Sequence, residues 1–442
     1  MSDRSCLSND LRTKPYWWEA AAPAAAAAPV AGLPRVDVAI VGGGYTGLSA
    51  ALELGRNGAT VAVLDSLPIG AGASSRNGGS VGGGLKLAGF DLQKRLGADK
   101  AGRVLTEAMG TLDFLEGLIE RERIDCSFCR SGRYIAAWSR GHLDLLKRRA
   151  EAMRGLGQDA VILEPGEQGR ELGSTRYHGG MLVASGARIH PGRYVQGLAR
   201  AAAAVGASLL GGCEVTACER NGSDDFRLRW RGPGAGTGEV LAERVIVATN
   251  AYTGRLTPWL QRRIVPVNSY MIATEPFPHD LRRRLDPNGR MFSDSKRLLS
   301  YFRMAPDEDR ALIGGRVSFG EISEDVAAVR LHRELAAIWP ELSGVKVSHA
   351  WKGRVAFTFD FMPHLGEQDG LLYAAGCQGA GVAMCSYLGT KLARRALGAP
   401  DAATAFADNS FPTRPLYSGN PWFLPVVGAG YRALDIFDRQ FR

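Results

Sequence analysis

The chain of 442 residues has no apolar run of the ~18 residues that a membrane-spanning helix requires. Residues 20–31 are Ala/Pro-rich but of low hydrophobicity, and this stretch resembles a linker. No Leu-rich core precedes it, and the N-terminal region shows no convincing secretory cleavage pattern. The sequence therefore predicts a cytoplasmic protein.

Cysteine is scarce and odd in number. The seven cysteines lie at positions 6, 126, 129, 213, 218, 377 and 385, which suits a reducing compartment better than a disulfide framework. Cys126 and Cys129 form a C-x-x-C pair, but no second pair and no histidine at ligand spacing accompany them. We expect two ordinary thiols and no metal site.

A clustered basic surface is also missing. The net charge is +9, yet the 54 basic residues are dispersed and no nucleic-acid-binding motif accompanies them, so we expect no nucleic-acid partner. Hydrophobic residues make up 45% of the chain and charged residues 22%, as in ordinary globular proteins. Because one hydrophobic core stops growing at about 250–300 residues, the length predicts two domains.

What the chain does have is a complete βαβ unit near its N-terminus. The apolar run 36–41 is typical of a buried parallel strand, and Gly42, Gly44 and Gly47 follow in G-x-G-x-x-G spacing. A second strand ends in Asp65, 18 residues after Gly47, where a carboxylate can accept hydrogen bonds from a ribose. A bare glycine turn would lack this context, so the unit predicts a dinucleotide on the helix N-terminus.

Further elements alternate between two kinds of pattern. Residues 73–79 form a polar, glycine-rich loop typical of a binding site. Residues 91–154 are mostly helical in period, with a strand at 132–137, and predict a cap. Strand-like runs at 264–274, 298–304 and 311–315, followed by a polar helix over 323–338, predict a sheet beneath that cap.

The dinucleotide domain resumes later in the chain. Residues 244–254 read as a buried strand followed by small and polar residues, and residues 370–384 as a short strand, then glycines, then a helix. Gly376, Gly379 and Gly381 leave backbone N–H groups at the positive end of that helix, which can stabilise negative charge on a reduced isoalloxazine ring. The alternative is a plain strand-to-helix turn.

An ordered set of motifs now resembles a known family across nearly the whole chain. The chain is similar to the FAD-dependent amine and amino-acid oxidases typified by D-amino-acid oxidase and sarcosine oxidase, and most of all to the γ-glutamylputrescine oxidase branch. The motifs are Tyr16-Trp-Trp18, Ile69–Gly79, Gly186–Pro191, Ala248–Tyr252, Tyr301-Phe-Arg303, Gly314-Gly-Arg316, Gly376–Ala383 and the tail segment Asn420–Pro425.

The resemblance implies an α/β fold in which a Rossmann-like FAD-binding domain is interleaved with an α+β substrate domain built on a mostly antiparallel sheet. The expected parts are an N-terminal arm and linker (1–32), the FAD-binding domain (33–96, 178–262 and 346–405), the substrate or cap domain (97–177 and 263–345) and a C-terminal tail (406–442).

The same resemblance implies which residues hold FAD. They are Gly42, Gly44, Tyr45, Thr46, Gly47, Asp65, Ser66, Ala73, Ser74, Arg76, Asn77, Gly78, Gly79, Val215, Thr249, Asn250, Gly376, Gly379, Ala380, Gly381 and Val382. Val215 would offer its backbone to adenine. Members with covalent flavin use a His in the loop or a Cys shortly before the last strand, and neither is placed that way, so we expect non-covalent FAD.

The sequence also departs from the family pattern. Asp65 stands where many relatives have Glu, and Ser75 where the branch usually has Gly. Cys377 and Ala380 replace an aromatic residue and a His in the last motif. We expect FAD binding to survive these changes, whereas the substrate preference can differ.

The chemistry implied is hydride removal from the carbon beside a neutral amine, followed by imine hydrolysis and reoxidation by O2 to give hydrogen peroxide. A cation near the flavin would help O2 accept an electron. Lys352 is the first candidate, against the alternative of a solvated surface lysine, and Arg316 is the second.

Other candidates would face the substrate. Tyr301 and Arg303 could bind an amine or a carboxylate, or they could simply pack in a sheet. His190 could touch the flavin or the substrate, or could cap the helix that follows Pro191. Met271 faces the substrate or belongs to the core.

The function expected is oxidation of a primary or secondary amine, such as the acylated diamine γ-glutamylputrescine, by an enzyme whose partners are this small molecule and O2. One alternative is an amino-acid oxidase or dehydrogenase that passes electrons to a quinone or carrier, with the tail Trp422–Phe441 as a peripheral membrane contact. Another, prompted by Cys377 and Ala380, is a non-catalytic FAD-binding subunit.

Overall fold

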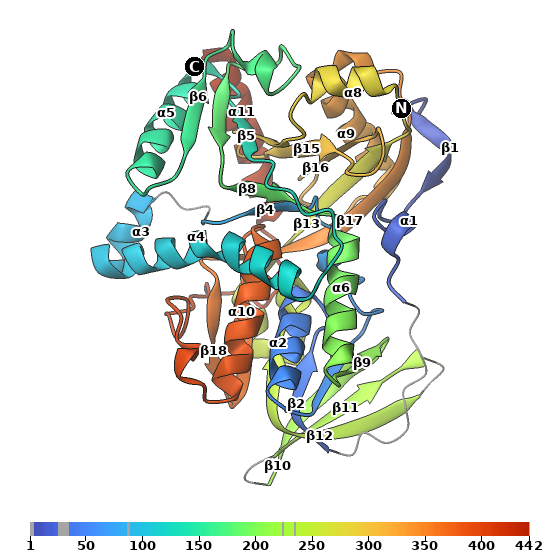
Figure 1. The fold of residues 1–442 in the computed structure, drawn as a ribbon, viewed down its shortest axis with the longest axis vertical. Coiled ribbons are helices and arrows are strands. Elements are labelled where there is room, and N and C mark those ends of the chain that lie inside the picture. The colour runs from blue at the N-terminus through green and yellow to red at the C-terminus, as the bar shows by residue number, and fades with distance from the viewer. Residues whose placement is uncertain (1–3, 25–34, 86–88, 223–224, 234–235, 442) are drawn as a thin grey trace.

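The computed structural model describes residues 4–24, 35–85, 89–222, 225–233 and 236–441, arranged as a lower and an upper half (Figure 1). The predicted linker 20–31 lies mostly outside the described residues. Within them, no helix has both the length and the apolar character to cross a membrane.

The lower half is built on a sheet with parallel strands at its centre. Its order is β10-β11-β12-β2-β3-β9, and β19 pairs with β12 and with β18. The strands are β2 (Arg35–Val41), β3 (Val61–Asp65), β9 (Ser208–Gly211), β10 (Glu214–Asn221), β11 (Asp225–Arg231), β12 (Thr237–Val247), β18 (His364–Gln368) and β19 (Leu371–Ala375).

Helices cover this sheet because their apolar faces need a partner. Helix α2 packs between α6 and α10, and α4 crosses between the two halves (Figure 1). The helices are α2 (Tyr45–Arg56), α3 (Gly89–Leu96), α4 (Ala98–Arg121), α6 (Pro191–Ala204), α7 (Pro258–Gln261) and α10 (Gly381–Ala396). The core includes Ile40, Leu48, Val63, Leu198 and Leu392, each almost fully buried.

The upper half contains a mostly antiparallel sheet of order β1-β17-β13-β16-β15-β14-β5-β7-β6. Only the β1–β17 and β14–β5 pairings are parallel within its described strands. The strands are β1 (Leu7–Arg12), β5 (Arg133–Ala136), β6 (Ala160–Leu163), β7 (Gly180–Val183), β13 (Ile264–Thr274), β14 (Met291–Asp294), β15 (Ser300–Met304), β16 (Ala311–Gly315) and β17 (Val347–Thr358).

The two faces of the upper sheet have different neighbours. Tyr134, Tyr270, Phe292 and Phe302 form one core with α9 (Glu324–Ile338). Residues on the opposite face meet either α5 (Arg140–Arg154) or the lower half. The remaining elements are α1 (Trp18–Ala21), α8 (His279–Leu285), α11 (Leu424–Phe441) and the two-stranded sheet β4 (Ser80–Gly82) with β8 (Gly186–Arg188).

The expected fold class is confirmed, and β13 and β16 have the bounds predicted from sequence. Sheet membership nevertheless differs from the expected domain limits at β1, β7 and β17, which all join the upper sheet. Strand pairing is a long-range property, and the apolar pattern of a strand does not specify the sheet that it joins.

Candidate functional site

A cavity of about 560 Å³ lies between the two halves. It runs from the end of β2 and the start of α2 to the upper sheet at β15 and β16. The predicted residues that line it are Gly42, Gly44, Tyr45, Thr46, Asp65, Ser66, Ala73, Ser74, Arg76, Asn77, Gly78, Val215, Thr249, Asn250, Tyr301, Gly379, Gly381 and Val382. Residues widely separated in sequence thus meet in one site.

The glycine turn is shaped for close backbone approach. Gly42 has φ +113°, and a Cβ there would lie 2.8 Å from the main-chain oxygen of Ala248. A Cβ at Gly47 would lie 1.9 Å from the oxygen of Gly42, so Gly47 allows α2 to pack against the strand rather than lining the cavity. Both roles match those expected of the motif.

Asp65 ends β3 beside this turn. Its Oδ2 accepts a hydrogen bond from Gly43 N at 2.7 Å, and its Oδ1 accepts one from Leu67 N at 2.9 Å. Burial raises the pKa of Asp65, while these two backbone donors oppose that shift. Each oxygen retains acceptor capacity toward the cavity.

The loop 72–79 is held from above by three indole rings. Trp17 Nε1 donates to Asn77 O at 2.9 Å, and Trp351 Nε1 donates to Arg76 O at 2.9 Å. Trp18 Nε1 donates to Ser75 Oγ at 3.0 Å. The N-terminal arm and β17 therefore jointly fix the loop that forms one wall of the cavity.

Asn250, which follows β12, is hydrogen-bonded to the glycine-rich turn that follows β19. Its Oδ1 accepts from Gly376 N at 3.1 Å, and its Nδ2 donates to Cys377 Sγ at 3.4 Å. Cys377 lines the cavity, while Gly376 and Ala380 support the turn from behind. Gly376 has φ +84° and Gly379 φ +85°, conformations that side chains rarely adopt.

Tyr301 forms the boundary between the loop and the upper sheet. A Cβ added to Gly78 would lie 3.0 Å from the Tyr301 ring, and one added to Gly314 would lie 2.4 Å from it. The Tyr301 hydroxyl lies 3.0 Å from Ser269 Oγ, and burial raises the pKa of this phenol. Tyr301 therefore presents a protonated hydroxyl in the cavity wall.

The position of Lys352 does not support the expected role as a cation beside the flavin. Its Nζ pairs with Glu321 at 2.6 Å and lies 3.8 Å from Glu324 at the start of α9. Successive side chains of a strand point to opposite faces, and Trp351 takes the face that meets the loop. Lys352 thus lies on the other face, whereas Arg316 lines the cavity.

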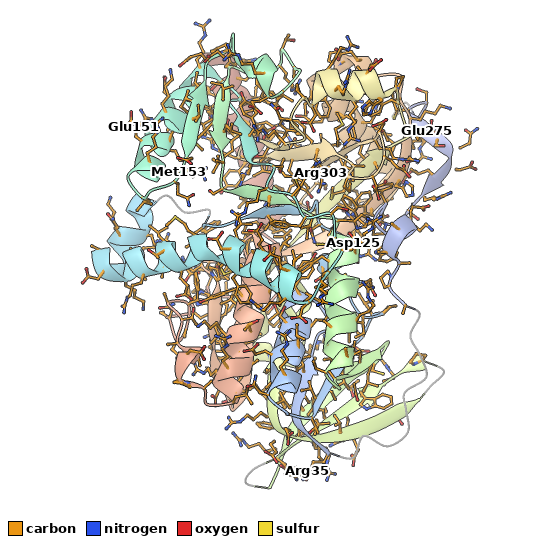
Figure 2. The ribbon with its side chains drawn as sticks, viewed as in Figure 1. Arg35, Asp125, Glu151, Met153, Glu275 and Arg303 are labelled. Carbon is orange, nitrogen blue, oxygen red and sulfur yellow. The ribbon has the colours of Figure 1, made fainter. Side chains whose placement is uncertain are left out.

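Three further candidates lie behind the cavity wall. Arg303 is 1% exposed and donates to the main-chain oxygens of Gly78 at 3.3 Å and Ile189 at 2.8 Å; Figure 2 labels it inside the upper half. His190 caps α6, accepting from Arg193 N at 3.1 Å. Met271 packs in a buried cluster with Trp17 and Trp351. None of the three lines the cavity, and Gly79, with φ +70°, is likewise structural.

A family model described as DAO, FAD dependent oxidoreductase, matches residues 37–395. The chain belongs to this family. Gamma-glutamylputrescine oxidoreductase of Escherichia coli (strain K12) is 33% identical over 410 residues, covering 91% of this chain and 93% of that one. A probable oxidoreductase, OrdL, of Rhizobium meliloti (strain 1021) is 33% identical over 390 residues, covering 86% and 88%.

The fold of this DAO-family chain also occurs in solved structures. Glycine oxidase from Geobacillus kaustophilus superposes with a TM-score of 0.70 at 24% identity, covering 86% of this chain and 99% of that one. The residues of the cavity fit FAD: Gly42 and Gly44 present bare backbone in its wall, and a Cβ at Gly44 would lie 2.9 Å from Ser74 Oγ on the facing loop. Gly42, Gly44 and Asp65 would hold its ADP half.

Several lining residues were missed from the sequence. Arg133, Ser269 and Ser293 come from three strands of the upper sheet and reach the same cavity. The strand containing Arg133 was predicted, but an arginine at the start of a strand carries no signal of what it faces. The pairing of β5 with β14 brings Arg133 and Ser293 together, and β15 and β16 join these strands to β13, which carries Ser269.

Proposed function

We propose that this DAO-family enzyme oxidises a primary or secondary amine of the γ-glutamylputrescine type, with O2 as electron acceptor. The observation that carries the proposal is the single cavity that joins the dinucleotide turn to the Tyr301 wall. The 33% identity to gamma-glutamylputrescine oxidoreductase over most of both chains supports this choice of substrate class.

The charge of the cavity favours a neutral amine. Its acidic lining residues, Asp65 and Glu214, belong to the lower half. Among the described residues, those lining it from the upper sheet include Arg133 and Arg316 but no acid. Nearby cations lower the pKa of an entering ammonium group, which exposes the nitrogen lone pair that hydride removal requires.

Bound FAD would supply the hydride acceptor, and its reoxidation by O2 would yield hydrogen peroxide. The chain's part is to position the amine. Tyr301 can accept a hydrogen bond from the amine while its own proton is directed to Ser269 Oγ, 3.0 Å away. At the start of α10, Gly381 and Val382 offer backbone N–H groups at a positive helix end, which would stabilise negative charge.

The test is the visible spectrum of the purified protein before and after anaerobic addition of γ-glutamylputrescine, putrescine, glycine and D-alanine. We expect a yellow protein that the acylated diamine bleaches, with colour and one equivalent of peroxide returning in air. Bleaching by glycine or D-alanine alone would show that the substrates are amino acids and not acylated diamines. A colourless protein that takes up no FAD contradicts the proposal entirely.

A second candidate is a dehydrogenase that passes electrons to a quinone at a membrane surface. It is favoured by the tail, where Trp422 is 66%, Val426 76% and Ile436 54% exposed. Oxygen uptake decides between the two: turnover with added quinone and none with air would support the dehydrogenase. Turnover in air at a comparable rate would exclude it.

A further inference from the structure

The cavity is lined by five arginines, Arg76, Arg133, Arg255, Arg316 and Arg354, and none of them forms an ion pair within the described parts of the chain. Arg133 Nη2 donates to Ser293 Oγ at 3.1 Å, and neither Arg133 nor Arg316 forms an ion pair. Arg316 instead lies over the Phe357 ring at 4.7 Å. A desolvated cation without a counter-ion is costly, so the free protein keeps unpaired positive charge in a substrate cavity.

The electrostatic surroundings of Arg133 increase this cost. Burial lowers its pKa to about 10, and the positive charge of Arg149 on α5 lowers it further. An anion bound at Arg133 would relieve both effects, because it replaces lost hydration and offsets the repulsion. Arginine also presents a fork of donors that matches a carboxylate.

The register of the upper sheet places Arg133 away from the loop 72–79. Gly78 contacts Tyr301 on β15, and Ser293 on β14 is paired with Tyr301. Arg133 is on β5, the next strand beyond β14. The Tyr301 hydroxyl reaches Ser269 on β13, whereas the Arg133 guanidinium reaches Ser293 on β14, three strands away in the order β13-β16-β15-β14. At about 4.8 Å per strand, these two groups lie about 14 Å apart.

This separation selects a class of substrate. In an α-amino acid the carboxylate is bonded directly to the carbon that is oxidised, so it cannot also reach a group three strands away. In an N-acylated diamine, a carboxylate on the acyl group is many bonds from the reacting amine. Such a molecule can span the distance between Tyr301 and Arg133.

We propose that Arg133, oriented by Ser293, binds a carboxylate carried by the substrate at the end remote from the oxidised carbon. This inference rests on the proposed amine oxidation and adds a specificity determinant to it. Arg316 adds positive charge on the Tyr301 side of the cavity, where it opposes the rise in the pKa of Tyr301.

The experiment compares two amines that differ only in this carboxylate, N-glutarylputrescine and N-butanoylputrescine. We expect Arg133→Gln to lower kcat/KM for the first by about 30- to 100-fold, as for loss of a charged hydrogen-bonded pair, and for the second by less than threefold. Arg133→Lys should recover part of the loss. Ser293→Ala should lose about three- to tenfold on the first substrate only.

Arg149→Gln is the matched control, because it removes the same charge from a neighbouring residue that does not line the cavity. It should leave both values within twofold of wild type. The subsite would be overturned if Arg133→Gln and Ser293→Ala each lowered kcat/KM equally for both substrates. It would also be overturned if neither variant lowered kcat/KM.

A binding measurement separates this inference from the proposed reaction. The probe is the monobutylamide of glutaric acid, which keeps the carboxylate and carries no amine, titrated into the FAD-loaded enzyme by calorimetry. Weaker binding to Arg133→Gln by at least tenfold supports the subsite even if no amine is oxidised. Oxidation of both amines with equal kcat/KM by wild type and Arg133→Gln keeps the reaction and rejects the subsite.

Discussion

The indole Nε1 of Trp17 donates a hydrogen bond to the main-chain oxygen of Asn77, 60 residues further along the chain. Trp17 is fully buried and lies in the N-terminal arm, while Asn77 lies in the loop that lines the FAD cavity. Strand β1 of the same arm pairs with β17, which contributes Trp351 to the same loop. The arm is therefore a part of the cofactor site.

Removing this hydrogen bond should weaken FAD binding. Trp17→Phe keeps an aromatic ring but leaves Asn77 O without its indole donor, at a cost of about 1–3 kcal/mol. We expect the Kd for FAD to rise about five- to 100-fold when apoprotein is titrated by flavin fluorescence. Trp422→Phe, at a residue 66% exposed, is the control and should leave the Kd unchanged. An unchanged Kd in Trp17→Phe would mean that the arm does not order the loop.

The side of the sheet on which Lys352 lies leads to the second prediction. Because its Nζ pairs with Glu321 on the face that carries α9, Lys352→Gln should change the rate of flavin reoxidation by O2 by less than twofold. The measurement is stopped-flow mixing of photoreduced enzyme with air-saturated buffer. A tenfold slower reoxidation would restore Lys352 as the oxygen-activating cation.

The Tyr301 hydroxyl gives the third prediction. Tyr301→Phe removes the group that lies 3.0 Å from Ser269 Oγ and should lower kcat/KM for the amine about tenfold, equivalent to about 1.4 kcal/mol. The Kd for FAD should stay within twofold, because the ring still fills the space between Gly78 and Gly314. Tyr387→Phe is the control, since that hydroxyl bonds Glu107 outside the cavity. A similar loss of kcat/KM in both variants would remove the special role of Tyr301.

Local patterns predicted the glycine turn and its surroundings well. Gly42, Gly44 and Asp65 lie together in the cavity wall because a βαβ unit is a short-range structure whose spacing dictates its geometry. The bounds of β13 and β16 were also predictable, since long apolar runs flanked by polar residues indicate strands.

The upper-sheet side of the cavity was not predictable in the same way. Whether a strand residue faces the cavity depends on which sheet the strand joins and on its register, and one step along β17 separates Trp351 at the loop from Lys352 at α9. Arg133 and Ser293, which are 160 residues apart in sequence, meet because β5 pairs with β14. These contacts are set by tertiary pairing, which the local pattern does not encode.

The buried cap of α6 leads to the last prediction, on acid stability. His190 is fully buried, and its Nδ1 accepts from Arg193 N at 3.1 Å, so the folded protein holds a neutral ring. Burial lowers its pKa to about 4, compared with 6.5 in the unfolded chain. As pH falls from 6.5 toward 4, the unfolded chain takes up this proton first, so stability present at neutral pH is lost across that window.

The loss due to this one group should reach about 2–3 kcal/mol at pH 4.5. His190→Asn keeps a good N-cap but has no titratable ring, so the variant should lose less stability than wild type between pH 7 and pH 4.5 by that amount. The measurement is urea unfolding of both FAD-loaded proteins at the two pH values. The contribution of His190 is the pH-dependent change in the free energy of unfolding of wild type minus the same change in the variant. Equal losses in the two proteins would show that the ring is already protonated, or that it titrates equally in both states.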